Sequence, residues 1–313
     1  MTVDSFPVGT RVARFLSATE IGYTVNSKPD SPTEGETDIY RLKVRSGQPV
    51  RVATVQGDVV ALAWSPDGSS MAFIAYTSAS GENHRLWLTS RDSAPRTITP
   101  LIPVNAREFV STDQIAVAFS PDGQYLLMVD TTVRPASSEP TTATLQVRQV
   151  ADGRFLWAPA SALRGDLRTS MAVWSRTSDR LYFQDPDPVA GQNGIHIWEP
   201  FDKVSLLTGL TGWTAPSISP DDRFVAYEVD GSDGKPHVAV RNLTSGVVRS
   251  LTPVFGRPVL LSDDRMLERH FVQQIAGAPG PAYIADRYYV LDLATSREVA
   301  LPSDFQALDF WLG

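Results

Sequence analysis

Few side chains in this sequence have the type and spacing that catalysis or metal binding requires. The chain has 4 histidines and no cysteine, which excludes disulfides, thiolate chemistry and cysteine-ligated zinc. It contains no His-Glu-x-x-His motif, no phosphate-binding glycine loop and no Gly-x-Ser-x-Gly nucleophile motif. The sequence therefore predicts no catalytic residue, no metal ion and no cofactor.

The histidines and the paired acidic residues fit structural roles better than a metal site. His84 and His237 fall at matching positions of a repeated pattern, each at the start of an expected third strand, so we expect them in separate sheets. The aspartate pairs at 221–222 and 263–264 occupy turns where other repeats have Pro-Asp-Gly or Asp-Gly. Aspartate suits such turns by itself, so we expect both pairs to be structural.

Six copies of a short motif set the register from which we predict the strands and the loops that could carry a binding site. Each copy has one serine after an apolar residue, and these marker serines are 43 to 55 residues apart. The two full copies are Ala-Trp-Ser-Pro-Asp-Gly at 63–68 and Ala-Phe-Ser-Pro-Asp-Gly at 118–123. The copy at 218–222 is nearly complete and the other three are weaker. The marker serines are Ser17, Ser65, Ser120, Ser175, Ser219 and Ser262.

Ser-Pro-Asp-Gly is typical of a type I turn between two strands. Serine accepts a backbone hydrogen bond, proline fixes φ at the second position, and glycine closes the turn. Alternating apolar segments flank the turn, for example 59–64 and 71–75, and this pattern predicts a β-hairpin. Two more short strands follow each hairpin, so each repeat has the four antiparallel strands and the length of a propeller blade.

The Trp-Ser-Pro-Asp-Gly repeats resemble those of TolB-like β-propellers, which are related to the WD-repeat class. The resemblance extends over roughly residues 11–312. It implies a protein partner and a periplasmic or extracellular location. Because that family includes docking modules, secreted sensors and non-catalytic domains of peptidases, the resemblance indicates architecture far more than function.

The six repeats predict an all-β fold, a six-bladed β-propeller of four-stranded antiparallel blades. It forms a single domain at 11–313 after an N-terminal leader at 1–10. Blades bury both faces against their neighbours, with the bulky residue before each marker serine between them. We expect segment 306–313 to be a closing strand that docks on the N-terminal blade. The expected blades are 11–57, 58–112, 113–167, 168–212, 213–256 and 257–305.

The connections that enter the innermost strands define the channel mouth, where we expect a ligand, because function usually lies on loops held by a rigid frame. They lie four to six residues before the position that precedes each marker serine. Their charged and aromatic side chains suit an acidic peptide or a carboxylate, but a solvated mouth would tolerate them equally. The predicted mouth residues are Arg11, Asp58, Gln114, Arg168, Trp213 and Arg257.

The composition excludes several kinds of partner. Lys and Arg number 28 against 35 Asp and Glu, so the net charge is −7. Such a chain lacks the basic face that duplex nucleic acid or anionic lipid requires. No apolar run approaches the ~18 residues of a membrane span, and no signal peptide is visible. We therefore expect a monomer that neither binds nucleic acid nor inserts into a membrane.

Three functions remain open at this stage. The first is a non-catalytic scaffold that binds a protein or peptide at the mouth and at long loops. The second is an enzyme acting on a carbohydrate or other acidic substrate in the channel, with Asp58 and Arg168 as its best candidates. The third is a sensor domain of a larger membrane-anchored protein. The expected long loops are at 26–38, 131–142, 185–193 and 274–282.

Overall fold

The computed structural model describes the chain as β-strands and turns in two compact units, which divide between Arg168 and Thr169. Among the described residues, none belongs to a helix with the length and apolar character of a membrane span. The described residues are 10–17, 19–28, 35–43, 47–76, 83–90, 96–97, 102–103, 116–132, 142–159, 163–164, 172–185, 194–201, 203–209, 216–230, 236–251, 258–262, 264–274 and 283–301.

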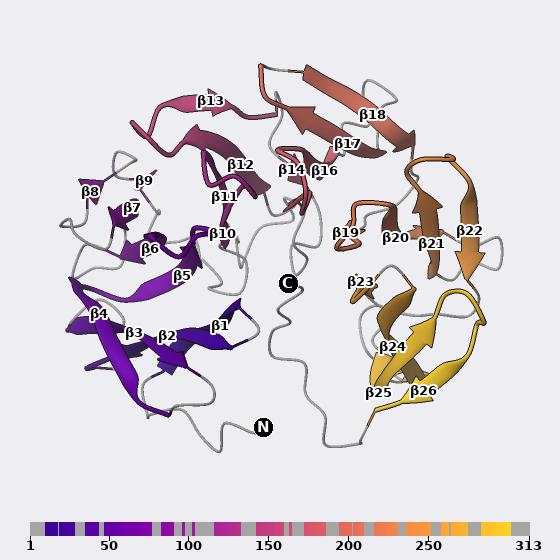
Figure 1. The fold of residues 1–313 in the computed structure, drawn as a ribbon, viewed down its shortest axis with the longest axis horizontal. Coiled ribbons are helices and arrows are strands. Elements are labelled where there is room, and N and C mark those ends of the chain that lie inside the picture. Colours follow the sequence, from indigo (N-terminus) through magenta and orange to yellow (C-terminus); the bar gives the residue numbers. More distant parts are fainter. Residues whose placement is uncertain are drawn as a thin grey trace. The chain divides into compact units, whose positions relative to one another are not determined.

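The first unit, as far as it is described, contains three antiparallel sheets in which consecutive strands are neighbours (Figure 1). The first sheet is β1 (Thr10–Ser17), β2 (Glu20–Asn26), β3 (Glu36–Lys43) and β4 (Pro49–Gln56). The second is β5 (Val59–Trp64), β6 (Ser70–Tyr76), β7 (Asn83–Ser90) and β8 (Arg96–Thr97), with β9 (Ile102–Pro103) also paired to β7. The third is β10 (Ala116–Phe119), β11 (Tyr125–Thr132), β12 (Thr142–Gln149) and β13 (Phe155–Trp157), with β14 (Leu163–Arg164) also paired to β12.

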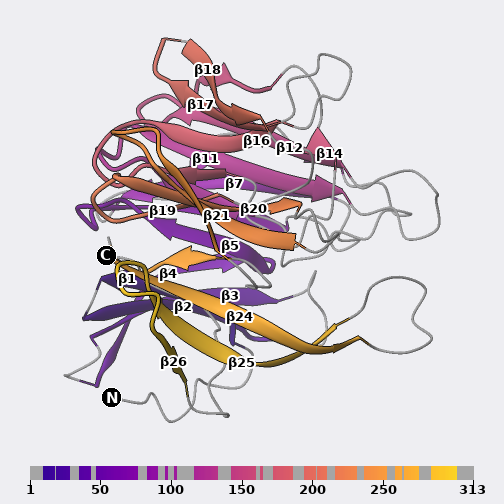
Figure 2. The same ribbon diagram turned by 90° about the vertical axis from the view of Figure 1, so that its right-hand side faces the viewer.

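The described part of the second unit likewise contains three antiparallel sheets. The first is β15 (Ala172–Trp174), β16 (Leu181–Asp185), β17 (Gly194–Glu199) and β18 (Lys203–Gly209). The next is β19 (Ser217–Ile218), β20 (Phe224–Asp230), β21 (Pro236–Asn242) and β22 (Val248–Leu251). The last is β23 (Val259–Leu260), β24 (Arg265–Gln274), β25 (Tyr283–Asp292) and β26 (Glu298–Ala300), and Figure 2 shows the long hairpin of β24 and β25.

The marker serines close the first hairpin of their sheets as the sequence predicts. The Gly68 amide donates to the Ser65 carbonyl at 2.8 Å, as a type I turn requires. The Ser65 hydroxyl accepts from the Ser70 amide at 2.8 Å and donates to Asp67 Oδ1 at 2.5 Å. Donation by Ser65, together with that by Ser69, lowers the pKa of Asp67 to about 2. Ser120 repeats these contacts, and its side chain is fully buried.

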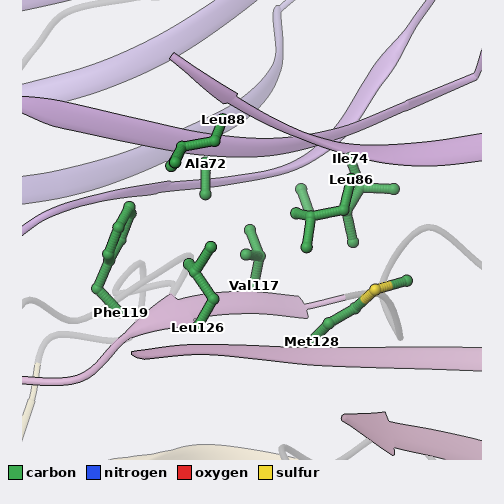
Figure 3. Packing of buried hydrophobic residues seen from close by; sticks show 9 residues of the cluster. Ala72, Ile74, Leu86, Leu88, Val117, Phe119, Leu126 and Met128 are labelled. Atoms are coloured by element: carbon green, nitrogen blue, oxygen red, sulfur yellow. The ribbon is translucent and has the colours of Figure 1, made fainter. Parts of the chain in front are cut away.

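A middle sheet buries both of its faces because alternate residues of a strand point to opposite sides. On β6, Met71, Phe73 and Ala75 pack in one cluster with Ile39 of β3 and Val55 of β4. The residues between them, Ala72 and Ile74, pack in another cluster with β10 and β11 (Figure 3). This explains why the strand is a continuous apolar run rather than a polar–apolar alternation.

The second unit follows the same rule on β20. Val225 and Tyr227 pack toward Tyr182 of β16, whereas Ala226 between them packs with Leu260 and Met266 of the following sheet. Within the sheet of β15–β18, the buried rings of Trp174 and Trp198 lie with their centroids 6.1 Å apart in an edge-to-face arrangement.

The last position of the first-hairpin turn lies against the preceding sheet. A Cβ on Gly68 would lie 3.2 Å from the Arg41 guanidinium of β3, and one on Gly123 would lie 3.6 Å from Pro66 of the previous turn. Asp222 occupies the same position in the second unit, with the left-handed φ of 57° that its counterparts also have. Its carboxylate accepts hydrogen bonds from Ser175 Oγ at 2.6 Å and the Thr177 amide at 2.8 Å. This turn position is therefore where neighbouring sheets are joined.

The predicted all-β, antiparallel architecture is confirmed, and the predicted third strands are β7, β12, β17, β21 and β25. His84 and His237 each lie second in such a third strand, in separate sheets. The expected closing strand 306–313 lies outside the described residues.

Candidate functional site

The structure fixes one of the predicted mouth residues, Asp58, in a buried polar contact. Asp58 directly precedes β5, and its side chain is 3% exposed. Its Oδ1 accepts a hydrogen bond of 3.1 Å from Nδ2 of Asn26, the last residue of β2, which is 2% exposed. A buried carboxylate needs such donors because burial otherwise disfavours its charged form. The contact therefore joins the end of β2 in the first sheet to the residue before β5 in the second sheet.

Backbone and side-chain bonds around this pair hold it in place. Thr37 of β3, which is fully buried, donates through its hydroxyl to the Gly57 carbonyl at 2.5 Å. The Gly57 amide donates to the Gly35 carbonyl at 3.0 Å, and Gly57 has the left-handed φ of 90° that glycine tolerates. Asn26 Oδ1 accepts from the Lys28 amide at 2.7 Å. Asn26 thus uses its amide in both directions, as a donor to Asp58 and as an acceptor for the following loop.

Arg11 lies near the start of β1, at the end of the first sheet where β2 ends with Asn26. It lies in β1, beside the pair in which Thr10 is opposite Val25, and Val25 directly precedes Asn26. The register shifts between Thr10 and Ala13, so the backbone at Arg11 is irregular. The structure therefore brings the backbone of Arg11 to the strand end where Asp58 is bound.

The other four predicted mouth residues lie outside the described residues. By sequence each of them precedes the first strand of its sheet. Their convergence with Arg11 and Asp58 stays a prediction. These residues are Gln114 before β10, Arg168 before β15, Trp213 before β19 and Arg257 before β23.

Asp58 is suited to a structural role at the strand ends and not to the role of a general acid or base. A general acid or base must lie within hydrogen-bond reach of its substrate, but Asp58 is almost fully enclosed and bound to Asn26. Its carboxyl oxygen, held by Asn26, is suited to fixing the backbone where β2 ends and β5 begins. Among the described residues, no group of three or more His, Asp or Glu side chains is arranged to hold a metal ion.

The marker serines and the buried histidine also have structural contacts. Ser65, Ser120, Ser175 and Ser219 are buried and bonded within or between turns. The His196 ring is 5% exposed and stacks on Phe183 with 5.6 Å between centroids. These contacts assign the hydroxyls and this imidazole to packing.

The sequence did not reveal Asn26 as the partner of Asp58. It appeared only as the first residue of a long polar loop, and it lies 32 residues from Asp58 in the chain. A single asparagine at the end of an expected strand carries no signal that names its distant partner. The sequence placed Asn26 at the end of one expected strand and Asp58 before another, and this gave no sign that the two side chains meet.

Solved structures share the fold of this chain despite low sequence identity. TolB from Acinetobacter baumannii is 16% identical with a TM-score of 0.52, over 92% of this chain and 64% of that chain. The β-propeller domain of the Trilobed protease from Pyrococcus furiosus is 11% identical with a TM-score of 0.53, over 95% and 99%. An oligogalacturonate lyase in complex with manganese is 11% identical with a TM-score of 0.55, over 96% and 78%.

These similarities define the fold as that of a TolB-like β-propeller, as the repeats predicted. At such identities they show the fold alone, and one fold supports many functions. The chain spans 64% of the TolB chain, which is less than two thirds of its length. No family profile and no curated protein sequence matches this chain.

Proposed function

We propose that this chain is a non-catalytic protein- or peptide-binding scaffold in which each sheet is one blade of a six-bladed β-propeller. The observation that carries the proposal is the buried hydrogen bond between Asn26 and Asp58, which ties the residue before β5 to the end of β2. Binding loops on propellers depend on rigid frames, because a fixed frame lowers the entropy lost on association.

In this proposal Arg11, Gln114 and Arg168 are the residues of the first unit that contact the ligand, and the buried Asp58 has a supporting role. Two arginines favour a carboxylate, since the guanidinium donates two parallel hydrogen bonds to it. An acidic peptide segment or a C-terminal carboxylate is therefore the proposed ligand chemistry. The fold similarity to TolB supports a binding role only at the level of architecture.

The test is quantitative capture from the native host with Arg11→Ala and Arg168→Ala, separately and together. Arg154→Ala is the matched control, because Arg154 is exposed and lies in the β12–β13 turn, which is not among the predicted mouth positions. We expect the double variant to lose the captured partner and to keep the wild-type melting temperature, while the control binds normally. Unchanged capture by the double variant would show that the proposed mouth is wrong.

The alternative is an enzyme that acts on an acidic carbohydrate, and the fold similarity to the oligogalacturonate lyase is the observation that favours it. It requires Asp58 to reach the substrate together with Arg168. Incubation with oligogalacturonate and Mn²⁺ distinguishes the two functions. Release of unsaturated products that Asp58→Asn abolishes would establish the enzyme.

A further inference from the structure

The turn that follows β15 binds a carboxylate from another sheet of the second unit. Ser175 directly follows β15, and Asp222 lies in the turn between β19 and β20. Asp222 Oδ2 accepts hydrogen bonds from Ser175 Oγ at 2.6 Å, from the Thr177 amide at 2.8 Å and from the Thr177 hydroxyl. Asp222 Oδ1 accepts from the Arg176 amide at 3.0 Å. Both oxygens of one carboxylate are therefore bound by donors of a single turn.

The turn also holds its donors in place through its own contacts. The Ser175 hydroxyl accepts from the Ser178 amide at 2.9 Å and lies 2.8 Å from the Ser178 hydroxyl. The Ser175 amide donates to the Arg180 carbonyl at 2.7 Å, and Ser175 is 1% exposed. Successive backbone N–H groups that point to one place form an anion-binding concavity. The contacts within the turn therefore preform a site for an anion.

A positive charge beside this turn favours an anion over a neutral acceptor. Burial lowers the pKa of the Arg176 guanidinium, and the negative charge of Asp222 partly offsets this effect. A partly buried guanidinium needs a counter-charge, because burial disfavours its charged form. If Asp222 were removed, a free anion at the same place would supply that counter-charge.

We propose that residues 175–178 form a carboxylate-binding site, which Asp222 occupies as an internal ligand and which accepts a free carboxylate when Asp222 is absent. In the turns at Ser65 and Ser120 the serine hydroxyl donates to an aspartate of the same turn. The turn at Ser175 instead takes its carboxylate from the neighbouring sheet. The site lies in a first-hairpin turn, whereas the predicted mouth residues lie in or before the first strands, so the two sites are tested separately.

Glycine at position 222 opens this site without straining the backbone. Asp222 has a left-handed φ of 57°, and Gly68 and Gly123 have φ values of 67° and 72° at the same turn position. The side-chain atoms that Asp222→Gly removes, a methylene and a carboxylate, match an acetate ion apart from a single hydrogen. Acetate can therefore place its two oxygens where Oδ1 and Oδ2 of Asp222 lie.

The test titrates the full chain carrying Asp222→Gly with sodium acetate at neutral pH, and with sodium chloride at equal ionic strength. Heteronuclear NMR follows the backbone amides, and thermal unfolding gives the melting temperature. We expect saturable shifts of the Arg176 and Thr177 amides in acetate alone. We also expect a melting temperature about 2 °C higher in acetate than in chloride, because a ligand that binds only the folded state stabilises it.

Wild type and Asp222→Asn are the matched controls, because a side chain still occupies the site in both and asparagine tolerates a left-handed φ. Neither is expected to respond to acetate, and acetamide, which has the shape without the charge, is expected to leave Asp222→Gly unchanged. An equal response of either control, or of Asp222→Gly to chloride, would overturn the proposal, as would the lack of a saturable shift. If Asp222→Gly is unfolded in chloride, acetate is expected to restore its native circular dichroism, and failure to do so would count equally against the site.

Discussion

Asp222 supplies Ser175 with the carboxylate that Ser175 lacks in its own turn. In the Ser-Pro-Asp-Gly turns the serine hydroxyl donates to an aspartate two residues later, as Ser65 does to Asp67. The turn after Ser175 has Thr177 at that position, and the hydroxyl instead donates to Asp222 Oδ2 of the neighbouring sheet at 2.6 Å. A degenerate repeat is thus completed by a residue 47 positions away.

Replacement of Asp222 tests this join between sheets. Asp222→Gly removes the acceptor for Ser175 and Thr177 but restores the residue that favours a left-handed φ, so we expect a loss of about 1–3 kcal/mol in the free energy of unfolding. Chemical denaturation measures it. Thr177→Ala in both backgrounds completes a double-mutant cycle, in which a coupling near zero would contradict the join.

Gly194 is required by close approach of two strands. A Cβ at this position would lie 2.1 Å from the Thr208 carbonyl oxygen of β18, which is backbone and cannot rotate away. We expect Gly194→Ala to cost about 2–4 kcal/mol, or to prevent folding. Gly47→Ala is the control, because nothing lies within 4 Å of its Cβ position and only its φ of 76° opposes alanine. Equal costs for the two variants would refute the steric explanation.

The Asn26–Asp58 contact is expected to matter more than an exposed pair of the same chemistry. Asn26→Ala removes the donor to a buried carboxylate, and we expect it to lower the free energy of unfolding by about 2–3 kcal/mol. Gln56→Ala removes an exposed amide that donates to Glu36 at 2.6 Å, and we expect about 0.5 kcal/mol or less. Urea denaturation of both variants decides, and a cost for Asn26→Ala as small as that for Gln56→Ala would count against the support role.

The pKa of Asp67 predicts a pH dependence. Hydrogen bonds from Ser65 and Ser69 lower it from the usual 3.8 to about 2. Because the folded pKa lies below the unfolded one, the stabilisation is complete above pH 3.8 and is lost as the pH falls toward 2. The difference in unfolding free energy between wild type and Asp67→Asn is therefore expected to shrink over this range. A constant difference from pH 5 to pH 2, or a carboxyl titration near 3.8 by NMR, would contradict it.

Phe201 is expected to be replaceable with a gain in stability. Asparagine tolerates a left-handed φ, and the 95% exposed ring contributes no buried area, so Phe201→Asn should raise the free energy of unfolding by about 0.5–1 kcal/mol. Phe155→Asn, a control at an exposed phenylalanine outside the left-handed region, is expected to give no gain. Thermal unfolding compares them, and equal effects would remove backbone strain as the cause.

The first-hairpin turns, most of the described strands and the burial of both sheet faces could be predicted from the sequence, but the extra strands β9 and β14 could not. The predictable features follow from local rules, because a Ser-Pro-Asp-Gly turn fixes a hairpin such as that at Ser65 and period-two apolar residues fix its faces. The predicted mouth positions depended on the same rules, and each of them falls in or just before the first strand of its sheet.

The pairing of polar residues between sheets, and the exposure of side chains on the outer strands, follow from the tertiary structure and not from the sequence pattern. Asn26 binds Asp58, and Asp222 binds Ser175, across adjacent sheets that are separated by 32 and 47 residues in the chain. The exposure of Val204 and Leu206 likewise depends on what packs beside β18. Such contacts depend on how packed sheets are spaced and turned, and the type of a single residue does not encode that spacing.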